Sequence, residues 1–325
     1  MVVSALLIVG ASSAAWWWYP SSLSPDVGPE VAGRRVPTLL SDRPETQAPT
    51  QPRPGVTEKG DTAAAHPTGP VPNSKRARQL LAAGRKALSA NEWVPAREHF
   101  NEAIATGLDG AELDQARADL TRINMETVFS PRVMPEDTLV GRHIIQPGET
   151  LGVIAKKYAV SDDFLARINN IKDKNRIRGG QTIKVVNGPF HAVVDVKRFT
   201  LSVYLGEGSE RTLMKQFSVG LGRDSSTPMG MWRVRNKLKD PTYYPPRGGL
   251  IVAADDPKNP LGERWIGLQG VGGDALGQQR YGIHGTIDPS SIGQNASMGC
   301  IRLYNEDVEE LFDLLIPGKS TIEVR

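Results

Sequence analysis

The chain begins with an uninterrupted apolar run. Val2 to Trp18 are almost all hydrophobic or small, and the first 25 residues contain no charged side chain. The run is close to the lower length limit of a membrane-spanning helix, and Trp16–Tyr19 resemble the aromatic residues found at a membrane interface. We therefore expect residues 1–19 to be a membrane anchor, with a cleaved signal peptide as the alternative. Either one would place the rest of the chain outside the cytoplasm, in the periplasm or the cell wall.

No helical or strand periodicity follows in residues 20–73. This stretch is rich in Pro, Ser, Thr and Gly. Because such a composition buries too little apolar surface to fold, we expect a disordered linker.

Residues 74–128 return to a helical period and predict two or three amphipathic helices. The stretch from Ala83 to Ile104 resembles one tetratricopeptide repeat. Since a single repeat rarely folds alone, a plain helical hairpin that acts as a spacer remains open. This segment is also where a protein partner could bind. The apolar positions are Leu80, Leu81, Ala87, Leu88, Trp93, Ala96, Phe100, Ala103, Ile104, Ala116, Leu120 and Ile123.

Residues 141–187 predict a small α+β module. A strand is followed by a turn at Pro147-Gly148, two short helices and a closing strand, which gives the order βααβ. Glu149-Thr150 suits a helix start, because a side-chain oxygen there can accept from unpaired backbone amides.

This pattern is similar to the LysM module over its whole length. The resemblance implies binding of glycans that contain N-acetylglucosamine, such as peptidoglycan, in a shallow groove between two loops. Those loops map to Gly148–Leu151 and Asn175–Gly179, and a small domain without a ligand is the alternative. The candidate glycan-binding residues are Gly148, Glu149, Thr150, Leu151 and Ile177.

From residue 190 to residue 325 the pattern changes to short strands separated by Gly and Pro. Ala192–Val196 and Thr200–Tyr204 predict a hairpin, and Asp307–Leu315 is the one clear helix. We expect a mainly-β domain. Further strands are predicted at Phe217–Gly220, Gly230–Val234 and Trp265–Leu268.

The charge balance adds little about partners. With 39 basic and 36 acidic residues the net charge is +3, so nucleic acid is not expected. A mildly basic surface still suits an anionic polymer such as a cell wall.

Cys300 is the single cysteine, so the chain cannot form an intramolecular disulfide. A lone cysteine is either a small buried hydrophobe or a nucleophile with a histidine base. Of the five histidines, only His191 and His284 lie in the same predicted domain. His191 opens a strand without special context, so His284 is the better base. One cysteine and two histidines do not form a familiar metal-ligand set, and we expect neither a metal nor a cofactor.

Gly299 directly precedes the cysteine. A glycine permits a tight backbone turn there and leaves room for a substrate carbonyl. The backbone amides of Gly299 and Cys300 are then the natural donors to an oxyanion.

These motifs, taken in order, resemble the L,D-transpeptidase family with its YkuD-type catalytic domain. The resemblance rests on His284-Gly285-Thr286 and on Ser297-x-Gly299-Cys300-Ile301-Arg302-Leu303, with Asn305 and Asp307 after them and Val219-Gly220 and Ser226–Trp232 upstream. It implies a multidomain chain whose mainly-β catalytic domain follows the LysM-like module and the helical segment.

The resemblance also implies roles for single residues. Cys300 is the acylated nucleophile, His284 is the general base, and the carbonyl of Gly285 orients its ring. Arg302 binds a substrate carboxylate or braces the loop, and Ser297 shapes that loop. Tyr281 and Met298 complete the candidate substrate-binding residues. Where the family often has a second histidine, this chain has Met298, which puts any role of such a histidine in doubt.

The implied reaction is acyl transfer on peptidoglycan stem peptides. The cysteine attacks the bond before the terminal D-alanine, and an amine or water resolves the thioester, giving a crosslink or L,D-carboxypeptidase activity. Carbapenems would acylate the same thiol. A sortase, a papain-like wall endopeptidase and a non-catalytic peptidoglycan-binding protein are the alternatives. The Cys300 context argues against the first, the order of His before Cys against the second, and the intact pair against the third.

Overall fold

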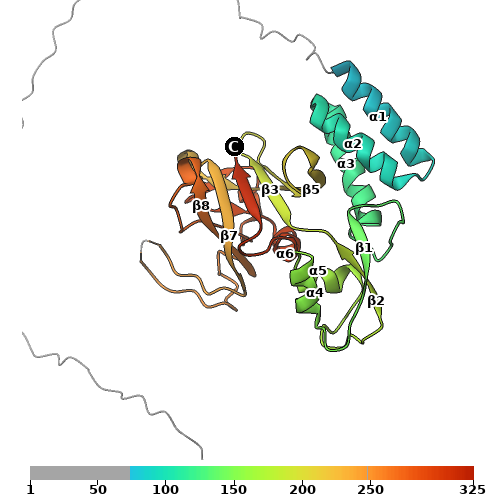
Figure 1. The fold of residues 1–325 in the computed structure, drawn as a ribbon. Coiled ribbons are helices and arrows are strands. Elements are labelled where there is room, and N and C mark those ends of the chain that lie inside the picture. Colours follow the sequence, from blue (N-terminus) through green and yellow to red (C-terminus); the bar gives the residue numbers. More distant parts are fainter. Residues whose placement is uncertain (1–73, 247) are drawn as a thin grey trace, which may run out of the picture. The chain divides into compact units, whose positions relative to one another are not determined.

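The computed structural model describes residues 74–246 and 248–325 (Figure 1). The expected anchor or signal peptide of residues 1–19 and the linker of residues 20–73 lie outside this range. Within it, no helix combines the length and the apolar character that crossing a membrane requires.

The predicted helical segment consists of three helices. They are α1 (Ser74–Ser89), α2 (Trp93–Gly107) and α3 (Gly110–Thr127). A side chain at Gly84 of α1 would place its Cβ 3.2 Å from the Phe100 ring of α2, so the missing side chain lets these helices approach closely. The helices agree with the sequence, whereas the likeness to a tetratricopeptide repeat stays a prediction.

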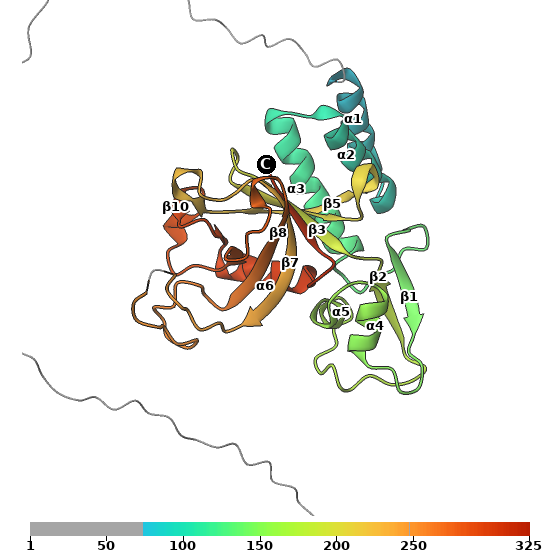
Figure 2. The same cartoon turned by 60° about the vertical axis from the view of Figure 1, so that its left-hand side comes forward.

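The next module has the predicted βααβ order. Strand β1 (Val140–Ile144) pairs antiparallel with β2 (Thr182–Val186), and α4 (Leu151–Lys157) and α5 (Asp162–Ile168) lie between them in sequence. In both views the two short helices lie beside the paired strands β1 and β2 (Figures 1 and 2). The core of this module is continuous with that of the following domain, since the rings of Phe164 and Phe190 meet edge to face at 5.2 Å.

The C-terminal domain is mainly β, as predicted. Its sheet has eight strands in the order β11-β9-β8-β7-β12-β3-β4-β5, and β6 and β10 form a separate parallel pair. The predicted hairpin is β3–β4, and the predicted helix is α6, which packs on β8 and β9. The strands are β3 (Phe190–Asp195), β4 (Thr200–Leu205), β5 (Thr212–Ser218), β6 (Leu221–Gly222), β7 (Gly230–Lys239), β8 (Arg264–Gly272), β9 (Gly282–His284), β10 (Asn295–Ser297), β11 (Ile301–Arg302) and β12 (Thr321–Val324), and α6 is Asn305–Leu314.

The helical segment is fastened to both following domains by buried polar groups. The side-chain amide of Asn124 in α3 donates to the carbonyls of Leu213 and Met214 in β5, at 2.8 and 2.9 Å. The buried Arg97 in α2 forms a bidentate pair with Asp137, just before β1. A buried charge that loses its partner destabilises the folded protein, so the Arg97–Asp137 pair favours the packing of α2 against the segment before β1.

Candidate active site

Cys300 lies on the turn that joins β10 to β11. Strand β11 runs parallel to β9, with Ile301 opposite Ile283 and Arg302 opposite His284. The cysteine therefore lies one residue before the ladder, level with Gly282, whose backbone N–H faces the sulfur. The parallel pairing brings the candidate nucleophile and base, sixteen residues apart in sequence, onto neighbouring strands.

The turn before the cysteine requires glycine. Gly299 has φ +126°, a backbone conformation that L side chains rarely adopt. A Cβ there would lie 2.5 Å from Cε1 of Tyr281 and 2.8 Å from the carbonyl oxygen of Ser226. Both conformation and space therefore disfavour any other residue at this position.

Ser297 closes the turn from within, in the loop-shaping place that the sequence suggested. Its hydroxyl donates to the carbonyl of Cys300 at 2.7 Å and accepts the N–H of Gly299 at 3.0 Å. This second bond corrects one expectation, because the Gly299 amide is already engaged and only the Cys300 amide remains for an oxyanion.

Thr227 holds the same turn from outside, and the sequence analysis did not single it out. Its hydroxyl donates to the carbonyl of Gly299 at 3.0 Å and accepts the N–H of Gly222 at 2.9 Å. Its place inside the Ser226–Trp232 motif was the available signal.

His284 is held as a neutral base. Its Nδ1 lies 2.6 Å from the carbonyl oxygen of Gly285, which can only accept, so Nδ1 carries the proton and Nε2 keeps a free lone pair. The indole of Trp265 stacks on the imidazole at 5.8 Å between ring centroids. Burial lowers the pKa of His284 to about 4, and the positive charge of Arg302 adds to this, against the effect of the Gly285 bond.

The segment after His284 is braced by α6. The Oδ1 atom of Asn305 accepts the N–H of Thr286 at 3.0 Å. Asn and Asp are common helix N-caps, but the N-cap residue of α6 is Tyr304 and no side chain caps that end. Asn305 instead stabilises the turn that positions Gly285.

Cys300 rests as a thiol. Burial raises its pKa, and this effect exceeds the opposing influence of the Gly282 N–H and of Arg302. Since His284 is neutral as well, the pair holds one proton on sulfur and has a free acceptor on the imidazole.

Arg302 has two separate roles in the structure. Its backbone exchanges hydrogen bonds with Gly220, at 2.9 and 2.8 Å, and so braces β11. Its side-chain Nε is buried and has no partner among the described residues. A buried donor without an acceptor is costly, which makes this guanidinium a candidate for a substrate carboxylate.

The remaining two candidates differ in their surroundings. Met298, two residues before Cys300, is 57% exposed. Tyr281 is half-buried, and its ring lies 5.3 Å from that of Trp232 while also facing Gly299. Tyr281 thus supports the turn.

Comparison with known proteins identifies the family. The profile of the YkuD L,D-transpeptidase catalytic domain matches residues 189–324, and that of the LysM domain matches residues 143–186. The chain is 30% identical over 188 residues to a Bacillus licheniformis protein provisionally designated L,D-transpeptidase YkuD, a match that covers 55% of this chain and 96% of the relative. The chain belongs to the L,D-transpeptidase family.

Two further matches have the same family designation. A Bacillus subtilis protein provisionally designated L,D-transpeptidase YqjB is 36% identical over 136 residues, which covers 42% of this chain and 71% of the relative. The solved L,D-transpeptidase from Mycobacterium smegmatis is 16% identical, covers 46% of this chain and 64% of that chain, and has a TM-score of 0.30. A structural likeness at that score carries no argument, and the assignment rests on the sequence matches.

In the LysM module, the second predicted glycan-binding loop packs against the residue that precedes the first one. Gly179 lies against Pro147, since a Cβ on Gly179 would be 3.5 Å from the backbone of Pro147. Ile177 lines a hollow of about 570 Å³ together with Arg176, Arg178 and Gln181. The helix–strand loop therefore offers an open, polar surface.

The first of the two loops differs from the expectation. Leu151 is only 1% exposed and packs in the core, so its side chain cannot contact a glycan. Thr150 caps α4 by accepting the N–H of Val153 at 3.3 Å, and the Glu149 carboxylate bonds to Nε2 of His143 at 2.8 Å. These side chains hold the loop, while Gly148, at φ +84°, makes its turn.

His191 is placed away from the nucleophile, on β3. Its Nδ1 bonds to the hydroxyl of Thr321 at 2.7 Å, joining β3 to β12. Among the residues that the structure describes, no cluster of three or more His, Cys, Asp or Glu side chains could hold a metal ion.

Proposed function

We propose that this chain is a peptidoglycan L,D-transpeptidase in which Cys300 forms a thioester with the donor stem peptide. The observation that carries the proposal is the bond between Nδ1 of His284 and the carbonyl of Gly285. It fixes a neutral tautomer whose Nε2 can accept a proton, on the strand next to the cysteine.

In the first step the sulfur attacks the carbonyl that joins the third stem residue to the terminal D-alanine. The thiol proton passes to Nε2 of His284 as the carbon–sulfur bond forms. The Cys300 N–H, which no described group engages, stabilises the negative charge on the carbonyl oxygen. The imidazolium then returns the proton to the nitrogen of D-alanine, which leaves.

In the second step an amine resolves the thioester. His284 takes a proton from the amine as it attacks, the carbon–sulfur bond breaks, and the proton returns to sulfur. The product is an amide crosslink or attachment. If water attacks, the same groups release a free carboxylate, which is L,D-carboxypeptidase activity.

Arg302 and Met298 would hold the stem peptide near the nucleophile. The unpartnered Nε of Arg302 suits a stem carboxylate, and the exposed Met298 offers a flexible apolar contact. The LysM module would bind the glycan strand through the loops at Gly148 and Ile177. Both activities belong outside the cytoplasm, where residues 1–19 would anchor the chain.

The test compares the wild-type chain with Cys300→Ala on purified disaccharide-tetrapeptide. Mass spectrometry of the products should show loss of D-alanine and a new crosslinked dimer with the wild-type chain only. Loss of D-alanine without a dimer would assign the carboxypeptidase reaction instead. The proposal would be overturned if the wild-type chain released no D-alanine and also formed no covalent adduct with a carbapenem.

A further inference from the structure

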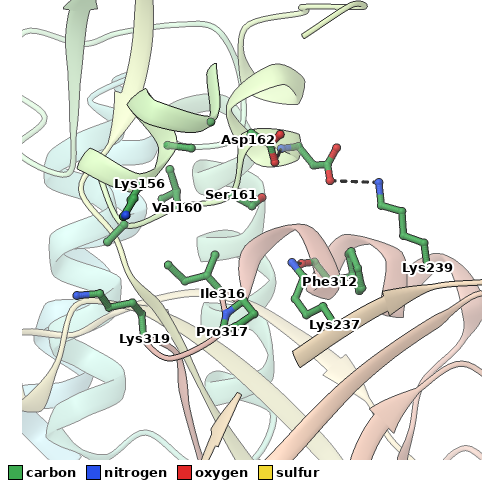
Figure 3. Close-up of a pocket in the computed structure, with 14 residues that line it drawn as sticks. Lys156, Val160, Ser161, Asp162, Lys237, Lys239, Phe312, Ile316, Pro317 and Lys319 are labelled. Atoms are coloured by element: carbon green, nitrogen blue, oxygen red, sulfur yellow. Dashed lines mark hydrogen bonds and ion pairs between the residues drawn. The ribbon is translucent and has the colours of Figure 1, made fainter. Parts of the chain in front are cut away.

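A second hollow, of about 600 Å³, lies where the LysM module meets the catalytic domain (Figure 3). Helices α4 and α5 form one wall, and β7, α6 and the segment after α6 form the other. This volume falls in the usual range of ligand-binding pockets. Cys300 does not line it, so it is separate from the catalytic thiol.

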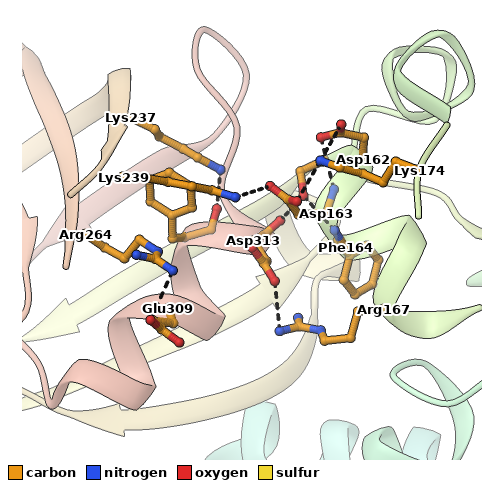
Figure 4. Close-up of polar contacts among 12 residues, drawn as sticks. Asp162, Asp163, Phe164, Arg167, Lys174, Lys237, Lys239, Arg264, Glu309 and Asp313 are labelled. Carbon is orange, nitrogen blue, oxygen red and sulfur yellow. Dashed lines mark hydrogen bonds and ion pairs between the residues drawn. The ribbon is translucent and has the colours of Figure 1, made fainter. Parts of the chain in front are cut away.

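The walls of the hollow are held together by polar contacts between the two domains. The hydroxyl of Ser161 donates to the carbonyl of Asp313, and Arg167 pairs with the Asp313 carboxylate at 3.2 Å (Figure 4). Asp163 pairs with Lys239 of β7 at 3.2 Å. Because both walls are tied, the hollow exists before any ligand binds.

The floor of the hollow is apolar. Ala155, Val160 and Phe312 line it and are almost fully buried, and Ile316 and Pro317 extend the same surface. A ligand here would gain free energy by covering this surface with small apolar groups.

Two of the four lysines that line the hollow are already committed. Nζ of Lys237 donates to the carbonyls of Phe312 and Leu315 and lies over the Phe312 ring, so it caps the end of α6. Lys239 is paired with Asp163, and Asp163 is shared with Lys174 (Figure 4).

The other two lysines are available. Among the described residues, no carboxylate lies within 4.0 Å of Nζ of Lys156 or Lys319. Lys156 comes from the LysM module and Lys319 from the catalytic domain, and both lie at the end of the hollow opposite Asp162 and Lys239 (Figure 3). The open end is therefore positively charged above an apolar floor.

The hollow lies on the other face of the sheet from His284. Leu238 of β7 is opposite Trp265 of β8, and Trp265 is opposite His284 of β9. Two strand spacings amount to roughly 10 Å. Lys237 and Lys239, which line the hollow, alternate with Leu238 along β7 and so point to the opposite face, which makes the hollow a site distinct from that of His284.

We propose that this hollow binds a carboxylate-terminated stem peptide of the glycan strand that the LysM module holds. Lys156 and Lys319 pair with the carboxylate, and small side chains such as those of alanine cover the apolar floor. This proposal rests on the proposed function, because it assumes a peptidoglycan ligand.

The test maps the site directly, using the full chain with Cys300→Ala so that no turnover occurs. A carbodiimide joins the carboxylates of disaccharide-tetrapeptide to the lysines they contact, and peptide mapping locates the adducts. We expect adducts at Lys156 and Lys319 well above those at Lys157, which neighbours Lys156 but does not line the hollow. The same disaccharide with amidated carboxylates should give none.

Affinity provides the second measurement. In the Cys300→Ala background, Lys156→Gln with Lys319→Gln should weaken binding of the disaccharide-tetrapeptide about fivefold, since two exposed ion pairs each contribute modestly. Lys157→Gln should leave it unchanged. Equal labelling of all three lysines, or unchanged affinity in the double variant, would overturn the proposal. The proposal would also be overturned if polyphosphate protected Lys156 and Lys319 from labelling more strongly than the unlabelled stem peptide does.

The two proposals fail separately. If Cys300 of the wild-type chain forms a thioester but the double variant binds the stem normally, the catalytic assignment stands and this site falls. If no thioester forms while Lys156 and Lys319 are labelled selectively, the binding site stands without the reaction.

Discussion

The Oδ1 atom of Asn305 lies 3.0 Å from the amide nitrogen of Thr286, so the first residue of α6 fixes the turn that carries the carbonyl partner of His284. This contact makes α6 part of the support of His284, the proposed base. If His284 is the base, substitutions in α6 should alter the rate of the proposed reaction even though α6 supplies none of the proposed reacting groups.

Asn305→Ala should lower the acylation rate of Cys300 about tenfold and the free energy of unfolding by about 1–3 kcal/mol, because it leaves the Thr286 N–H without an acceptor. Asn305→Asp keeps an acceptor oxygen and should restore most of the rate. Acylation by a carbapenem, followed by mass, measures the rate, and denaturant unfolding measures stability. Equal rates for the Ala and Asp variants would show that the bond does not position the base.

Gly299→Ala should destabilise the chain by more than about 2 kcal/mol, since backbone strain and a clash with Tyr281 and Ser226 add together. Gly293→Ala is the matched control. Gly293 also has a positive φ, of +81°, but nothing lies within 4 Å of its Cβ position, so it should cost only about 1 kcal/mol. If both variants unfold at the same denaturant concentration, the close contacts at Gly299 do not matter.

The acid limb of the pH–rate profile should lie near pH 4, because burial lowers the pKa of His284 to about 4 and the base works only when neutral. Carbapenem acylation of Cys300 measured from pH 3.5 to 8 gives the midpoint. His284→Gln should be slower by about 10²–10⁴-fold and should lack this limb. A wild-type midpoint near 6.5 would contradict the buried, neutral imidazole.

Stability should respond to the same group. The unfolded imidazole, with its pKa of 6.5, takes up a proton as the pH falls, whereas the folded one resists until about pH 4. The unfolded state therefore binds more protons in that window, and the free energy of unfolding should fall between pH 6.5 and 4. Denaturant unfolding of the wild type and of His284→Gln isolates the effect, which should be missing from the variant. Parallel pH dependence in the two would argue against it.

Much of the fold follows from the sequence because its signals are local. The helical period in residues 74–128, the cap at Thr150 and the Gly-bounded strands each depend on neighbours within a few residues, and each agrees with the structure. The pairing of β9 with β11 was not visible in this way. That pairing joins two short strands that are separated in sequence by β10 and its flanking loops, so no local signal reports it.

Three predictions differ from the structure because the sequence pattern does not decide which hydrogen-bond partner a polar group takes or which face of an element is buried. The sequence pattern allows Leu151 to be either a loop residue that contacts a ligand or the first core residue of α4. Its burial shows that it is the core residue. Asn is a common cap residue, but the side chain of Asn305 accepts from the Thr286 N–H and makes no cap bond to α6. The Gly299 amide was expected to be free until Ser297 was seen to accept from it.

Intact-protein mass measures most directly whether Cys300 becomes acylated with His284 as its base. Incubation with disaccharide-tetrapeptide, quenched in acid, should add to the wild-type chain the mass of the disaccharide-tripeptide acyl group, on Cys300. Cys300→Ala should gain nothing, and His284→Gln should gain it at least about a hundredfold more slowly. Two results would contradict acylation of Cys300 with His284 as its base. In the first, D-alanine is released from the substrate while the wild-type chain stays unmodified. In the second, His284→Gln is acylated as fast as the wild-type chain.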